Sequence, residues 1–400
     1  MATVSTVIST NLNLVSDYSK RFYKVAPTKF PTATFGLVNT GAPMNDIYVR
    51  WGNKTTLQTS TQINYASGYS NSDTSIVVDS TEGMRSGQLV FVPRTGEIFR
   101  ITTVTNTTTL GVIVRGVTAE TGGVAAALVD NDTLIVLSTP VDESFAYSNA
   151  PSALMYSPAD IYNQMQTFVE PINISGRTLE LIKRGVLKYQ EVFADKQADA
   201  MELVKQALNR SLLFQGSATK AGSDGVNTKT GGIRWNAVNN GGSLNSSVGD
   251  LSNPLTFENA IKTTCLWAGT NQMMMTCSPT ALQSIQRLYQ GGNIGAFTGQ
   301  VLEMVGVQVH RITTPWGVSI NCYLDYLLED YYDNTNSRYL GQFLLWDPKD
   351  VKWRPNRPLG RYRPPQTADV MVEYIMGEGG WELGPGKKQL VGIGVTPITA

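Results

Sequence analysis

The sequence predicts an α+β protein in which one long helix lies among many short strands. Three observations lead to this fold class. Apolar residues recur at three-to-four spacing over 177–214, and short β-branched runs separated by turn residues fill 72–138. From residue 254 onwards, helix-like and strand-like patterns alternate, without tandem repeats or heptads.

Residues 1–50 are mostly polar and contain prolines that block a continuous helix, at Pro27, Pro31 and Pro43. We therefore expect an extended arm that lies on another surface, followed by a strand over IYVRWG, 47–52. The start lacks the basic and apolar regions of a secretory signal, and no apolar run approaches the ~18 residues of a membrane span. We expect neither export nor membrane insertion.

The segment 72–138 is predicted to be a separate β module. Turn residues divide it into strand-like runs about ten residues apart, as in small barrels and sandwiches. The runs are SIVVDS, GQLVFVP, EIFRITTVT, TLGVIVRGV and DTLIVLS. We expect five or six strands, and the absence of a chemical motif favours a packing or interface role.

A single long helix is predicted from about Arg177 to Phe214, with Ser175 as its N-cap. At 1.5 Å per residue this rod would be about 57 Å long. Only Gly185 interrupts the pattern, so the rod is either continuous or divided there. Gly216 is expected to end it in a left-handed conformation.

After the rod, the Gly-, Ser-, Asn- and Thr-rich segment 216–254 is expected to be a long loop. Two helices and several strands follow. The helices are predicted over NPLTFENAIKTTCLWAG and PTALQSIQRLYQG, and the strands over QMMMTCS, VGVQVHRITT and VSINCYLDYLL. The end of the chain is expected to form one strand, a Gly-rich bend and two further strands.

The composition argues against several classes of protein. Charged residues make up 16% of the chain, below the usual ~25%, which indicates a surface that neighbours cover. The net charge is zero, whereas a dedicated nucleic-acid binder needs a basic face. Three scattered cysteines fit a reducing cytoplasm better than a disulfide framework or a zinc site.

The catalytic inventory is poor. The one histidine, His310, lies in an alternating strand and is expected to be structural. Phosphate-binding glycine motifs are absent. The acidic residues of 325–333 lack the spacing of a calcium loop, so we expect a solvated face there; they are Asp325, Glu329, Asp330 and Asp333. The sequence predicts no catalytic residue, no cofactor and no metal.

One basic stretch is the candidate interaction site. Its six cations are Lys349, Lys352, Arg354, Arg357, Arg361 and Arg363. They could contact phosphates or an acidic neighbour, or they could pair with carboxylates of their own chain. Because arginine and aromatic residues are enriched at interfaces, we favour contacts between subunits, with DNA contact as the second option.

The order of the parts resembles the major capsid proteins of tailed bacteriophages, which have the Hong Kong 97-like fold, in the subfamily with a β insertion before the spine helix. Four stretches carry the resemblance: FPTATFGLVNTGAPMNDIYVRWGNKTTL, DSTEGMRSGQLVFVPRTGEIFRITTVTNTTTLGVIVRG, ADAMELVKQALNRSLLFQG and TFENAIKTTCLWAGTNQMMMTCSPTALQSIQRLY. One departure is Asn209, where the family often has Glu; its absence would remove a salt bridge of the spine helix.

The resemblance implies a division of the chain into five parts. They are an N-terminal arm (1–50), an extended loop region with the β insertion (51–156, insertion about 72–138), a peripheral domain with the spine helix (157–230, helix about 177–214), an axial domain (231–340), and return strands of the peripheral domain that end in the axial domain (341–400).

The resemblance also implies a structural, non-enzymatic function: a head subunit that assembles into pentamers and hexamers of an icosahedral shell around double-stranded DNA. Assembly would occur in the host bacterial cytoplasm. No long charged helix precedes the arm, so a separate scaffolding protein is expected, together with a portal and possibly a decoration protein. The alternatives are an encapsulin-like compartment shell, and less favoured, a secreted β-rich adhesin or a hydrolase.

Overall fold

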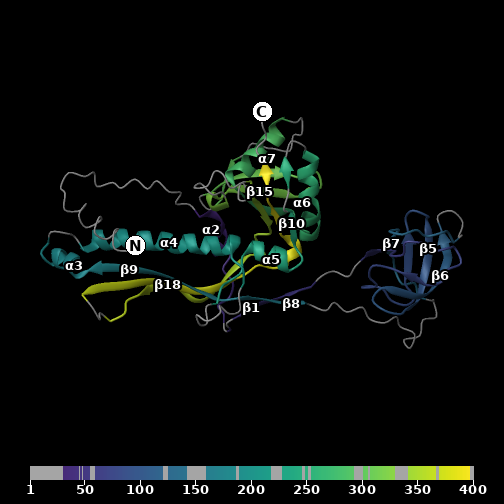
Figure 1. The fold of residues 1–400 in the computed structure, drawn as a ribbon, viewed down its shortest axis with the longest axis horizontal. Helices are drawn as coiled ribbons and strands as arrows, with labels where there is room; N and C mark the ends of the chain where they lie inside the picture. Colours follow the sequence, from purple (N-terminus) through teal and green to yellow (C-terminus); the bar gives the residue numbers. More distant parts are fainter. Residues whose placement is uncertain are drawn as a thin grey trace. The chain divides into compact units, whose positions relative to one another are not determined.

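The computed structural model describes residues 30–44, 46, 48–54, 59–119, 125–141, 159–185, 189–217, 228–245, 248–250, 254–291, 301–304, 307–328, 341–365 and 369–396. The chain divides into two compact units, which are considered separately. One unit comprises Met1–Trp51 together with Asp160–Ala400, and the other is Gly52–Ala159 (Figure 1).

The unit Gly52–Ala159 contains a six-stranded antiparallel sheet with the strand order β2-β7-β4-β5-β6-β3. Its strands are β2 (Ser60–Gln62), β3 (Ile76–Val77), β4 (Leu89–Val92), β5 (Glu97–Val104), β6 (Thr109–Ala119) and β7 (Thr133–Val136). The five predicted strands are confirmed, and β2 is an additional one. The hydrophobic core of the unit Gly52–Ala159 consists of residues of this unit alone, among them the fully buried Ile63, Val90, Phe99 and Leu134.

A buried ion pair stabilises this unit. The Arg115 guanidinium donates to both carboxylate oxygens of Glu97, at 2.6 and 2.7 Å, and the backbone N–H groups of Gly116 and Ala126 donate to the same carboxylate. Burial raises the pKa of Glu97, but these hydrogen bonds outweigh burial, so the pKa is lowered overall. The carboxylate therefore holds β6 and the backbone at Ala126 together.

In the other unit, a helix lies along a three-stranded antiparallel sheet with the order β17-β18-β9 (Figure 1). The strands are β9 (Gln166–Ser175), β17 (Lys352–Tyr362) and β18 (Val370–Glu382). The apolar residues between helix and sheet include Phe168, Ile172, Ile174, Ile375, Ala200, Val204, Leu208 and Leu212. Two further strands, β1 (Tyr48–Asn53) and β8 (Ala159–Gln164), pair with each other.

The predicted 38-residue rod is wrong as a single helix, and the divided alternative is the observed one. It consists of α3 (Gly176–Lys183) and α4 (Tyr189–Phe214), with Gly185 between them at φ 76°. The Gly185 N–H bonds to the Ile182 carbonyl, which ends α3 in a left-handed turn. The predicted N-cap is confirmed, because the Ser175 hydroxyl accepts from the Thr178 N–H. At 26 residues, α4 is about 39 Å long.

The arm is not extended throughout. Residues 1–29 lie outside the described residues, but α2 (Pro31–Val38) is helical, because Pro31 occupies the first turn, where its missing N–H has no cost. The chain then runs extended along the outer edge of β17. There the Gly41 N–H bonds to the Trp353 carbonyl at 2.9 Å and the Met44 N–H to the Pro355 carbonyl at 2.9 Å.

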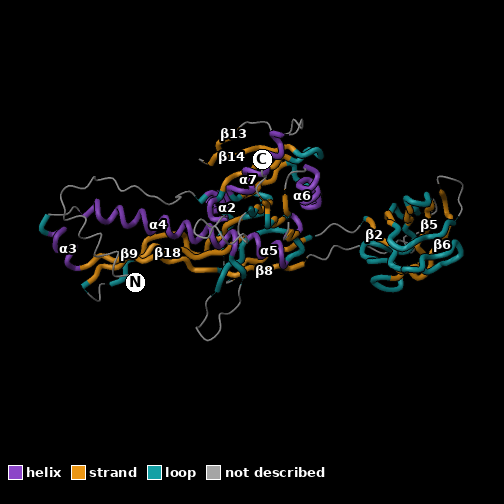
Figure 2. The backbone as a smooth tube through the Cα atoms, turned by 45° about the horizontal axis from the view of Figure 1, so that its top comes forward, coloured by secondary structure: helices purple, strands orange, loops and turns teal. Residues whose placement is uncertain are grey.

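A mixed seven-stranded sheet forms the second layer of this unit, with the order β10-β19-β16-β12-β15-β14-β13 (Figure 2). Its strands are β10 (Ser243–Asn245), β12 (Gln272–Cys277), β13 (Val301–Met304), β14 (Val307–Thr313), β15 (Ser319–Leu324), β16 (Phe343–Trp346) and β19 (Leu390–Gly392). Both faces are buried. Residues such as Met273 and Met275 contact α6 (Pro254–Ala268) and α7 (Pro279–Gly291), whereas Met274 joins the core beneath α4.

The predicted long loop over 216–254 is wrong for part of its length. Residues 233–245 form α5 (Ile233–Asn239) and β10, and β11 (Gly249–Asp250) pairs with β20 (Val395–Thr396). The short helices η2 (Tyr326–Leu328) and η3 (Gly386–Lys388) complete the elements. Gly216 has no left-handed conformation, contrary to our expectation. Instead, the Gly232 N–H bonds to the Gln215 carbonyl at 2.7 Å and turns the chain back onto the end of α4.

Candidate functional site

A buried polar junction joins the arm, the long helix and the seven-stranded sheet. The Thr32 hydroxyl of α2 donates to Asp325 Oδ2 at 2.6 Å, and Asn209 Nδ2 of α4 donates to the same oxygen at 2.8 Å. Asn209 Oδ1 accepts the Ala33 backbone N–H at 2.7 Å. One amide side chain therefore holds both the arm helix and the carboxylate, and we refer to these residues as the arm junction.

The hydrogen bonds continue into the sheet. The Tyr323 hydroxyl donates to Thr32 Oγ1 at 3.2 Å, and Thr276 donates to the Tyr323 hydroxyl. Trp346 Nε1 donates to Thr276 Oγ1 at 3.1 Å. Tyr323, Thr276 and Trp346 are fully buried on β15, β12 and β16. The network therefore fixes the arm helix to the centre of the sheet.

Asp325 was expected to lie on a solvated acidic face, and that expectation is wrong. Its side chain is fully buried at the end of β15, beneath the arm helix. Burial raises its pKa, while hydrogen bonds from Asn209, Thr32 and the Leu327 N–H oppose the rise. Glu329, Asp330 and Asp333 lie outside the described residues. No local pattern could have revealed the junction, because Thr32 and Asp325 are 293 positions apart.

The identity of residue 209 follows from this geometry. A glutamate at this position would bring a second carboxylate against a buried carboxyl group, which costs free energy unless a cation accompanies it. An amide supplies one donor and one acceptor, and both are used. The neutral Asn209 is therefore matched to Asp325.

The junction offers no chemistry of its own. Among the described residues, no group of three or more His, Cys, Asp or Glu side chains could hold a metal ion. All three cysteines are buried, and burial raises the pKa of Cys265 to about 11, so this thiol is not activated as a nucleophile. None of the described helices has the length and apolar character needed to cross a membrane.

Half of the predicted basic stretch pairs with carboxylates of its own chain. Lys352 and Arg354 lie near Glu382, at 3.8 and 2.8 Å, and Arg357 lies 3.5 Å from Glu378. Both carboxylates belong to β18, the neighbour of β17. Arg354 also donates to the Ala42 carbonyl of the arm at 2.7 Å. These cations therefore fasten the arm and the hairpin.

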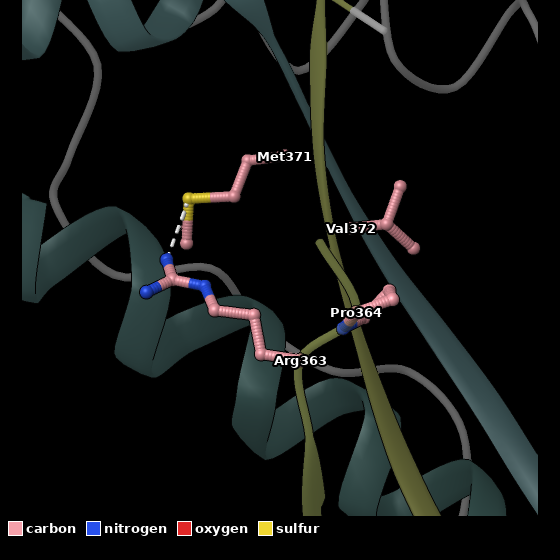
Figure 3. A pocket seen from close by; sticks show the side chains of 4 residues that line it. All are labelled: Arg363, Pro364, Met371 and Val372. Atoms are coloured by element: carbon pink, nitrogen blue, oxygen red, sulfur yellow. Dashed lines mark hydrogen bonds between the residues drawn. The ribbon is translucent and has the colours of Figure 1, made fainter. Parts of the chain in front are cut away.

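The far end of β17 is different. Residues 356–362 are all exposed, and they include Leu359 at 42%, Tyr362 at 55% and Arg361. Beyond them, Arg363 donates to the Met371 sulfur at 2.8 Å and lines a small surface pocket with Pro364 and Val372 (Figure 3). Lys349, the sixth cation, is exposed in the turn before β17. The structure thus separates the stretch into a paired inner part and an exposed outer part.

The described residues form a helix fixed on a long hairpin sheet, an arm locked by a buried junction and a β unit with its own core. The chain belongs to the SU10 major capsid protein family, whose profile matches residues 2–396. It is a structural subunit of a virion capsid. No curated protein sequence matches the chain significantly.

Solved structures with a similar chain path include capsids and an encapsulin. The capsid of an empty GTA particle has a TM-score of 0.48 at 9% identity, covering 98% of this chain and 99% of its own. The Mycobacterium phage Bobi structure has a TM-score of 0.46 at 10% identity, covering 98% of both chains. The SrpI encapsulin of Synechococcus elongatus has a TM-score of 0.42 at 11% identity, covering 61% of this chain and 79% of its own.

Proposed function

We propose that this capsid subunit assembles into rings of five and six copies that close as an icosahedral shell around double-stranded DNA. The observation that carries the proposal, beyond the family, is the locked body of arm, long helix and hairpin. A wall one subunit thick needs such stiff parts, and many modest contacts make a closed shell resistant to dissociation. A separate scaffolding protein, a portal and possibly a decoration protein belong to the same proposal.

The proposal also assigns two domains of the capsid subunit to the two sheets of this unit. The three-stranded sheet with α4 is the peripheral domain, and the seven-stranded sheet with α6 and α7 is the axial domain. Electron microscopy of the protein expressed alone and with the neighbouring phage genes tests the assembly. Uniform shells from this chain alone would contradict the need for a scaffolding protein, and absence of shells under every condition would contradict the function.

We further propose that the exposed end of β17 contacts a neighbouring subunit. Arg361 together with Leu359 and Tyr362 combines a cation with apolar surface, as interfaces do. The Arg361→Glu variant should keep the fold and lower the yield of empty shells about tenfold or more. A tenfold weaker contact between subunits corresponds to about 1.4 kcal/mol of binding free energy. Arg100→Glu, an exposed arginine of the β unit, is the control.

The same experiment separates subunit contact from DNA contact. If Arg361→Glu shells form normally without DNA but package less of it, the stretch faces the genome. Normal assembly and normal packaging would remove both roles.

A further inference from the structure

Four large apolar side chains are exposed on α5, β10 and α6, which are linked by contacts of α5 with β10 and of both helices with η3. They are Val238 of α5 (50% exposed), Leu244 of β10 (44%), and Leu266 and Trp267 of α6 (63% and 46%). A single exposed apolar side chain is ordinary, whereas a contiguous group marks a contact surface. We call these four residues the β10-edge patch.

Printed contacts join the elements that carry the patch. Lys387 Nζ of η3 lies 4.6 Å from the centre of the Trp267 ring. The Lys387 side chain also lies against Gly241, 3.6 Å from where a Cβ would be. Gly242 approaches Ala237, the neighbour of Val238, so closely that a Cβ would lie 2.7 Å from its Cα. In Figure 1, α5, β10 and α6 follow one another along the same side of this unit.

The patch surrounds an open sheet edge. β10 is the outermost strand of the seven-stranded sheet and pairs with β19 on one side only. Among the described strands, none pairs with its other edge. An edge strand that carries an exposed leucine favours association with another chain.

We propose that a second copy of this chain docks on the β10-edge patch. The inference rests on the proposed function and names a surface for it: the chain belongs to a capsid family, so copies of itself are abundant partners. Trp is the residue type most enriched at interface hot spots. A nucleic acid would require a denser set of cations than Lys387, whose ammonium lies over the Trp267 ring.

A closed ring gives this surface a particular partner. Contacts within a ring are heterologous, so one side of a subunit meets a different side of its neighbour. The β10-edge patch is one half of such a contact, and the surface that faces it on the second copy is a different one. The apolar core of the contact comes from the four patch residues, with Lys387 at its rim.

The test is hydroxyl-radical footprinting of Trp267 by mass spectrometry. Purified shells are compared with subunits dissociated from the same shells. We expect oxidation of Trp267 to be at least fivefold slower in shells. Equal oxidation rates in both states would overturn the inference while leaving the capsid function intact, whereas the absence of shells would overturn both.

Variants give an independent readout. Leu266→Asp adds a charge to a side chain that is 63% exposed, so the subunit should keep its helix content and unfolding midpoint. We expect its shell yield to fall at least tenfold. Val238→Asp is a second variant on another element. Shell yields within twofold of the unmodified protein for both variants would contradict the docking surface.

Discussion

At the scale of single residues, Asn209 and Asp325 show how hydrogen bonds from the described residues accommodate a buried carboxyl group. Three donors, from Thr32, Asn209 and the Leu327 N–H, replace the water that the carboxyl group loses. Leaving any of them unmatched costs more free energy than the bond itself contributes. The arm junction therefore specifies one position for the arm helix.

Asn209→Leu should lower the free energy of unfolding by about 3 kcal/mol, because the Ala33 N–H and Asp325 each lose a buried partner. Urea denaturation of the soluble subunit measures this change. Asn239→Leu, which removes one exposed hydrogen bond to the Trp235 carbonyl, should cost less than about 0.5 kcal/mol. Similar losses in both variants would contradict the role of the junction.

The pKa of Asp325 predicts an unusual pH dependence. Burial raises the pKa above its ordinary value of 3.8, so the folded subunit holds this proton more tightly than the unfolded chain does. The contribution to stability is fully present below pH 3.8 and is lost as the pH rises through the raised pKa. The free energy of unfolding of the unmodified protein minus that of Asp325→Asn should therefore fall as pH rises. A difference that grows with pH would show a lowered pKa instead.

At the scale of elements, local pattern predicts structure where its period is clear and fails where distant contacts decide. The five β-branched runs and the α4 stripe follow from periodicity, and Ser175 follows from capping chemistry. The α2 helix is not predictable from the prolines alone, because proline usually interrupts a helix, whereas Pro31 starts this one. α5 was missed because glycine and asparagine dominate its surroundings, while contacts with the end of α4 and with η3 stabilise it.

The paired half of the basic stretch was also beyond local pattern. Alternation in β17 does not reveal that Glu378 and Glu382 lie on the neighbouring strand. The edge position of β17, by contrast, was predictable, because Pro355 and Pro358 disfavour a central strand.

The break between α3 and α4 depends on the backbone of Gly185. Its φ of 76° is unfavourable for other residues, and no atom lies within 4 Å of where a Cβ would be. Gly185→Ala should therefore cost about 1 kcal/mol through the backbone alone. Gly216→Ala is the matched control, since Gly216 has no positive φ, and it should be nearly neutral. Equal unfolding midpoints for the two variants would contradict this account of the break.

At the scale of the whole molecule, the two units have separate cores. The core of the β unit contains residues 63–136 only, and the buried cores of the other unit contain none of them. Each unit therefore buries its apolar side chains in a core of its own. The separate cores predict that the other unit folds without the β unit.

Replacing 59–141 by a short Gly-Ser linker should leave a soluble protein that retains its helices. We expect its thermal midpoint to change by less than about 3 °C and its assembly to be altered. Circular dichroism and sedimentation of the purified variant check both points. Insolubility from loss of core packing would show that the two cores are coupled.

The central claim is that this chain is a capsid subunit whose exposed surfaces are covered by contacts with further copies of the same chain. Electron cryomicroscopy of particles assembled from it tests that claim most directly. The account predicts closed shells in which each subunit shows α4 along the β9–β17–β18 sheet and the β10 edge against a neighbour. A compact monomer that stays monomeric at every concentration, with or without the other phage proteins, would contradict it.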